Sequence, residues 1–218
     1  IDGESKDNTM NIVNKFRDKI DIIISEKDNG LSDAMNKGVK LANGEYIIHM
    51  HSDDMFTTEN SLAKLVNKID SEKGNWVTGF YKYINEKNEI FKEDKITEYS
   101  LKDMLIRNLV RHQATLLKKE IFYEISFNKE YGYAMDYYFF LKVWKNFGPP
   151  IIIREYIASF RLDGNNLSSD FFKSLKDEMK ARLNYRKDTN KLYFLPFDFL
   201  VYGLRKLKIL LIHQHTKI

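Results

Sequence analysis

Two adjacent carboxylates follow an apolar run in the segment YIIHMHSDD, residues 46–54. Asp53 and Asp54 repel each other unless a counter-charge lies close to them. Mg²⁺ and Mn²⁺ prefer oxygen ligands, and Mg²⁺ is often held by one or two carboxylates together with phosphate oxygens. The pair therefore indicates a Mn²⁺ or Mg²⁺ site. The residues alone leave one alternative open, in which a carboxylate caps the helix that starts at Thr58 or Asn60.

A third acid, Asp136, stands among aromatic and apolar residues in the segment GYAMDYYFFL, at the start of a predicted helix. A carboxylate in this place is either the N-cap of that helix or a base for proton transfer. His112 and Gln113 open a predicted strand in the segment HQA and put two hydrogen-bonding side chains at its start. They form either part of a site or a polar pair at a strand edge.

A second kind of metal site is a weaker hypothesis. His49 and His51 fall on one face of a predicted strand, and Asp53 offers a third ligand for zinc. The sequence contains no P-loop, no G-x-G-x-x-G and no G-x-S-x-G motif. Kinase, dehydrogenase and serine-hydrolase functions therefore lose support.

Strands and helices alternate along the chain, which predicts an α/β fold with a mixed, mostly parallel sheet flanked by helices. Residues 19–30 are predicted as a buried strand, residues 31–44 as a helix and residues 45–51 as a second strand parallel to the first. Two strands are predicted around the turn at residues 85–88, and a helix over residues 100–110. Ligands of such sheets bind beyond the carboxyl ends of the strands, where Asp2, Asp53 and Asp54 are expected.

The composition is that of a globular protein: 218 residues, 43% of them hydrophobic and 30% charged. There is no cysteine, no signal peptide and no apolar run of about 18 residues, which fits a cytoplasmic location. The net charge is +4, and residues 191–218, with five basic residues and one acidic residue, account for all of it. Because the basic residues do not cover the main body, a nucleic-acid partner is not expected.

Residues 191–218 are predicted as a basic amphipathic helix. Leu200, Leu204, Leu207 and Leu211 recur at helical spacing. Such a helix either lies on the inner face of the membrane as a peripheral contact or packs on the body or on a second subunit of a homodimer.

The ordered set of motifs resembles the family 2 glycosyltransferases over residues 1–169. It consists of IDGESKDNT, DNGLSDAMNKGVKLANGEYI, HSDD, HQA, MDYYFFLKVWKNFG and IASFRLDGNNLS. The resemblance implies a GT-A, Rossmann-like domain over residues 1–169, followed by a C-terminal helical extension over residues 170–218. It also implies inverting transfer from a UDP- or GDP-sugar to a saccharide or a lipid-linked acceptor, in polysaccharide or glycoconjugate synthesis.

The resemblance carries roles over to single residues. Asp136 matches the catalytic base, Asp54 and Asp53 match the D-x-D region that holds the metal and the donor, and Asp2 matches the acid that contacts the nucleotide base. Asp28, Gly30 and Asp33 match the loop and helix start beside the donor. His112 and Gln113 are expected on the acceptor or the donor side.

The sequence departs from the family in two places. His51 stands where many members have the first Asp of D-x-D, and the first strand and helix of the family are expected before Ile1. Two other functions are therefore kept as hypotheses: a non-catalytic binding or scaffold protein with this fold, and a metal-dependent phosphohydrolase that uses Asp53, Asp54 and the histidines.

Overall fold

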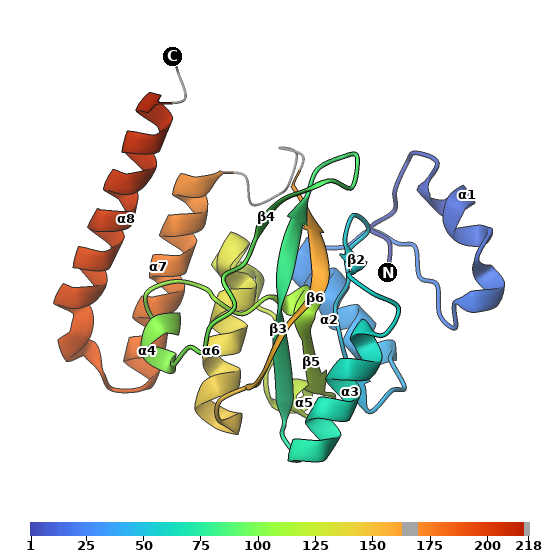
Figure 1. Cartoon of the computed structure of the whole chain (residues 1–218), viewed down its shortest axis with the longest axis horizontal. Helices are drawn as coiled ribbons and strands as arrows, with labels where there is room; N and C mark the ends of the chain where they lie inside the picture. The colour runs from blue at the N-terminus through green and yellow to red at the C-terminus, as the bar shows by residue number, and fades with distance from the viewer. Residues whose placement is uncertain (163–169, 216–218) are drawn as a thin grey trace.

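The structure, a computed structural model, describes residues 1–162 and 170–215 (Figure 1). Its strands are β1 (Tyr46–Ile47), β2 (Met55–Phe56), β3 (Trp76–Ile84), β4 (Ile90–Glu93), β5 (Thr115–Lys118) and β6 (Ile151–Arg161). Its α-helices are α1 (Thr9–Asn14), α2 (Leu31–Leu41), α3 (Ser61–Glu72), α4 (Leu101–Met104), α5 (Ile121–Glu124), α6 (Met135–Phe147), α7 (Phe171–Asp188) and α8 (Leu195–His215). Its 3₁₀ turns are η1 (Arg17–Lys19), η2 (His112–Ala114), η3 (Lys129–Ala134) and η5 (Leu192–Phe194).

The six described strands form one mixed sheet in the order β1-β5-β3-β6-β2. Strand β4 lies off this order and pairs with the C-terminal end of β3. An α/β fold with helices around the sheet is thereby confirmed. The direction of the strands needs a correction, because β3 pairs in parallel with β6 but antiparallel with β4 and β5. The outer pairs β1·β5 and β2·β6 are antiparallel as well. The sheet is thus mixed but not mostly parallel.

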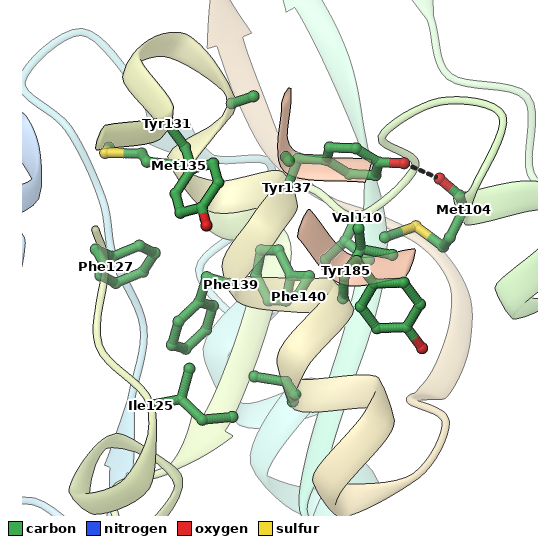
Figure 2. Close-up of a cluster of buried hydrophobic side chains, with 14 of the residues drawn as sticks. Met104, Val110, Ile125, Phe127, Tyr131, Met135, Tyr137, Phe139, Phe140 and Tyr185 are labelled. Atoms are coloured by element: carbon green, nitrogen blue, oxygen red, sulfur yellow. Dashed lines mark hydrogen bonds between the residues drawn. The ribbon is translucent and has the colours of Figure 1, made fainter. Parts of the chain in front are cut away.

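Helices cover both faces of the sheet (Figure 1). Side chains alternate along β3, so that Trp76 joins the core under α6 while Val77 packs with Leu65 and Ile69 of α3. Figure 2 shows the core around α6, in which Phe139 and Phe140 are buried and the Tyr137 hydroxyl donates to the Met104 carbonyl at 2.8 Å. This dense aromatic packing fixes the N-terminal turn of α6, where Asp136 lies.

Four predicted elements differ from the structure. The strand predicted at residues 45–51 is shortened to β1, which pairs antiparallel with β5, and the strand predicted to open at His112 and Gln113 begins after them at Thr115. Residues 19–30 contain no described strand beyond a single parallel bridge between Ser25 and Asp2, and Ile20 and Ile22 remain partly exposed. The predicted helix at residues 100–110 begins with the expected Ser100 cap but ends at Met104. The following turn is held by Arg182 and Arg205, whose side chains donate to the Ile106 carbonyl.

The remaining predicted elements have mixed outcomes. The hairpin of β3 and β4 and helices α3, α6 and α8 occur where they were expected. Helix α6 ends at Gly148, whose φ of 82° favours glycine. The motif residues DGNNLS, 163–168, lie outside the described residues, as does the predicted domain boundary at residue 169.

Candidate active site

Gln113 connects the turn η2 to the first of the predicted carboxylates. Its amide nitrogen donates to Asp54 Oδ2 at 2.8 Å, and the backbone N–H of Arg161 lies 3.4 Å from Asp54 Oδ1. Gln113 is 1% exposed, and its Oε1 is buried with no partner among the described residues. Burial raises the pKa of Asp54, against the hydrogen bond from Gln113, which lowers it.

Asp136 lies in the first turn of α6 and accepts hydrogen bonds from two neighbours. Its Oδ1 accepts from the Tyr137 backbone N–H at 2.7 Å, and its Oδ2 accepts from Asn108 Nδ2 at 3.0 Å. His112 Nδ1 faces the same Oδ2 at 3.5 Å. Because an ionised carboxylate offers about four acceptor sites, Asp136 can accept one more proton or hydrogen bond.

The alternative of helix caps is wrong for all three acids. The N-cap of α6 is Ala134, not Asp136. The N-cap of α3 is Asn60, which lies several residues beyond Asp53 and Asp54. The carboxylates are therefore not used to satisfy these helix ends.

His51 extends the row of polar side chains that starts at Asp136. Its Nε2 lies 2.8 Å from His112 Nε2, and the two rings meet edge to face. Because the carboxylate of Asp136 favours a proton on His112 Nδ1, His112 Nε2 is left to accept from His51. Burial, and next the proximity of His112, lowers the pKa of His51 to about 4. The neutral imidazole is thus favoured at His51.

The zinc hypothesis is wrong for the described residues. His49 packs against Phe122 and Phe127, and its Nε2 is buried without a partner in the described part of the chain. Across residues 1–162 and 170–215, no group of three or more His, Asp or Glu side chains could hold a metal ion. Asp53 is exposed, and it is adjacent to Asp54 in the chain. Two adjacent carboxylates fit a cation whose other ligands are phosphate oxygens, and they do not fit a cation held by protein alone.

The predicted donor residues form a second cluster in the loops before α2. Asp2 accepts from the Ser25 hydroxyl at 2.6 Å and from the Ser5 hydroxyl at 2.5 Å, and these bonds lower its pKa to about 2. Asp28 Oδ1 accepts from the backbone N–H of Gly30 at 2.8 Å, where φ is 100°.

The second acid of that loop sits at the start of α2. Asp33 accepts from the Asn29 backbone at 2.9 Å, which lowers its pKa, and lies 3.5 Å from the Lys37 ammonium. The neighbouring Ser32 hydroxyl donates to the sulfur of Met135 at 2.6 Å. Since Met135 precedes Asp136, the N-terminal turns of α2 and α6 lie side by side. The end of the donor cluster at Asp33 therefore lies beside the turn of α6 that carries Asp136.

Two residues of the site were missed in the sequence. Asn108 gave no signal, because it lies in a stretch with helical spacing. Gly3 directly follows Asp2, and a Cβ on it would lie 2.6 Å from Asp28 Oδ2. A glycine next to a candidate acid is a usable signal, because it allows this close approach of two loops.

Comparisons with known proteins identify the family and the fold of the chain. The family model for glycosyl transferase family 2 matches residues 1–137. The Escherichia coli UDP-Glc:alpha-D-GlcNAc-diphosphoundecaprenol beta-1,3-glucosyltransferase WfgD is 26% identical over 211 residues, which cover 94% of this chain and 81% of that protein. A PGL/p-HBAD biosynthesis glycosyltransferase of Mycobacterium bovis is 27% identical over 202 residues, which cover 85% and 74%.

Solved structures show the same fold. S. aureus TarS 1–349 matches with a TM-score of 0.61 and 19% identity over 84% of this chain. The mannosyltransferase PcManGT from Pyrobaculum calidifontis, in complex with GDP-Man and Mn²⁺, matches with a TM-score of 0.60 and 12% identity over 93% of this chain. The chain spans 55% and 62% of these two structures. The chain belongs to glycosyl transferase family 2 and has the GT-A fold.

Proposed function

We propose that this glycosyltransferase moves a sugar from a UDP- or GDP-sugar to an acceptor hydroxyl with inversion, in polysaccharide or glycoconjugate synthesis. One observation carries the proposal: the neighbours His112 and Gln113 contact Asp136 and Asp54, respectively. The turn η2 thereby contacts two carboxylates that have different surroundings. Inverting transfer needs two such groups, one at the leaving diphosphate and one at the attacking hydroxyl.

Asp136 is the proposed general base. It accepts the proton of the acceptor hydroxyl while that oxygen forms a bond to the anomeric carbon, and the bond from this carbon to the diphosphate oxygen breaks. The displacement takes place on the opposite face of the sugar, so the configuration inverts. Asn108 and the Tyr137 N–H hold the carboxylate in place from two sides.

The donor is proposed to bind across both clusters. Asp54 and Asp53 are the residues that would hold Mn²⁺ or Mg²⁺, which when bound neutralises charge on the diphosphate. Asp2 is the proposed contact of the nucleotide base. Asp28, Gly30 and Asp33 border the same donor, with Asp28 fixing the turn at Gly30 by its hydrogen bond.

The acceptor is proposed to be a saccharide or a lipid-linked saccharide. The name of the Escherichia coli relative states an acceptor linked to diphosphoundecaprenol, and the name of the Pyrobaculum calidifontis structure states Mn²⁺. A peripheral contact of residues 191–218 with the inner face of the membrane belongs to this proposal, and a homodimer is the competing use of the same segment.

Titration calorimetry with a panel of UDP- and GDP-sugars, with and without Mn²⁺, tests the proposal. We expect one donor to bind in a Mn²⁺-dependent manner, and Asp54→Asn to weaken it by about tenfold or more. The matched control Asp18→Asn, on the exposed turn η1, should leave the affinity unchanged. If no donor binds, the scaffold hypothesis is favoured instead. Release of phosphate in the absence of any acceptor would favour the phosphohydrolase.

A further inference from the structure

Helix α8 exposes a continuous apolar face to solvent. Five exposed apolar residues recur every three or four positions along the helix, and we call them the outward face of α8: Phe197, Leu200, Leu204, Leu207 and Leu211. Leu200 and Leu204 are each 59% exposed, and Leu207 is 53% exposed. Helix α8 lies at the edge of the molecule on the outer side of α7 (Figure 1). The outward face is therefore not covered by the described part of the chain.

The inner side of the same helix carries charged side chains beside the buried Val201, whereas an ordinary surface helix buries an apolar face. Asp198 is fully buried and pairs with both nitrogens of the Arg186 fork, at 2.9 and 3.1 Å. Arg205 pairs with Glu178 of α7. Helix α8 is thus fastened to the body by ion pairs, and its leucines are not needed to attach it.

The charges beside the outward face are positive. Lys191, Lys206 and Lys208 are exposed, while the one acid among the described residues of this segment, Asp198, is buried and paired. A second copy of the chain placed face to face on α8 would bring lysines against lysines. An anionic surface instead meets a complementary charge at each of them.

The same helix is unsuited to crossing a bilayer. Among the described helices, none combines the length and the apolar character of a membrane span. Between Phe197 and Leu211 a helix rises by about 21 Å, and Lys206 and Lys208 interrupt this stretch. An apolar face with flanking lysines is the pattern of a helix that lies in the plane of the membrane interface.

We propose that the outward face of α8 docks on an anionic lipid surface, with its leucines in the headgroup–acyl boundary and Lys206 and Lys208 at the phosphates. This inference deepens one part of the proposed function, the peripheral contact of residues 191–218 with a membrane, and it rests on α8 and not on the transfer reaction. A chain that binds vesicles but no nucleotide sugar would contradict the proposed transfer reaction and leave this inference standing.

Co-sedimentation of the full chain with vesicles tests it. One set of vesicles is pure phosphatidylcholine, and the other has equal parts phosphatidylcholine and phosphatidylglycerol. We expect binding to the anionic vesicles, weakened by salt. The variant L200Q/L204Q/L207Q should lose at least about tenfold in partition coefficient, and K206Q/K208Q about fivefold per lysine. Circular dichroism checks that both variants keep their helices.

Matched variants elsewhere on the surface serve as controls. Leu62→Gln with Ile90→Gln removes exposed apolar side chains outside α8, and Lys40→Gln with Lys87→Gln removes exposed lysines. Both should bind vesicles as the parent does. Equal binding by the triple leucine variant would overturn the proposal. The proposal would also be overturned if the parent bound neither kind of vesicle and formed a dimer in sedimentation velocity that the triple leucine variant did not form.

Discussion

Gln113 Nε2 lies 2.8 Å from Asp54 Oδ2, and this bond fixes the carboxylate that the chain places at the end of an apolar run. The preceding residue in the chain, His112, faces Asp136. A single short turn, η2, therefore sets the relative placement of two acids that are far apart in the sequence. Substitutions in this turn should affect both stability and donor binding.

Replacing Gln113 by Met should destabilise the fold and weaken the donor complex. The variant removes the donor to Asp54 and leaves a half-buried carboxylate without its partner, which costs about 1–3 kcal/mol in free energy of unfolding. Urea denaturation measures this cost. Asn43→Met, at an exposed loop position, is the matched control and should change little. Equal stability of Gln113→Met and the parent would show that the bond does not hold Asp54.

The sequence alone selects the candidate chemical residues of the site, whose roles stay predictions. Asp54 and Asp136 stand out because a carboxylate after an apolar run, or among aromatic residues, has no packing use. The structure brings both against the same turn, where they meet His112 and Gln113, which the sequence predicts as a hydrogen-bonding pair. The helix α6 also followed from its spacing and from Gly148, because its signals are local.

The rest depends on contacts between distant segments. Residues 19–30 have the apolar, β-branched composition of a strand, but only Asp2 pairs with them, so the composition misled. The residues after α4 have the spacing of a helix, but the Ile106 carbonyl accepts hydrogen bonds from Arg182 and Arg205 instead. In the same turn, the Asn108 side chain donates to Asp136. The spacing of residues within one segment cannot predict hydrogen bonds to distant segments.

His49 should make the protein sensitive to acid. Burial lowers its pKa from 6.5 to about 3, so the unfolded chain binds a proton at this residue before the folded chain does. The free energy of unfolding therefore falls as pH drops below 6.5, by up to about 1.4 kcal/mol per pH unit from this group, until about pH 3.

The substitution His49→Phe isolates this effect, since the ring already packs against Phe122 and Phe127. Urea denaturation at about pH 7.5 and about pH 5 should show a smaller acid loss in the variant than in the parent. The same loss in both proteins would mean that other groups account for the acid sensitivity.

The ion pair between Arg186 and Asp198 should be essential for attaching α8. Asp198→Ala leaves a buried guanidinium without its partner, which costs about 3–5 kcal/mol. The double variant Arg186→Met/Asp198→Leu removes both charges and should recover most of that loss. Thermal unfolding followed by circular dichroism compares the three proteins. An Asp198→Ala variant as stable as the parent would contradict a structural role for the pair.

The transfer step itself is tested most directly by Asp136→Asn, which keeps the shape of the side chain and removes the base. With the donor identified by calorimetry, sugar transfer to the acceptor is followed under single-turnover conditions for the parent and the variant. The account predicts a loss of about 100-fold or more in the rate of transfer with an unchanged donor affinity. A variant that transfers sugar at the rate of the parent would contradict the assignment of Asp136 as the base.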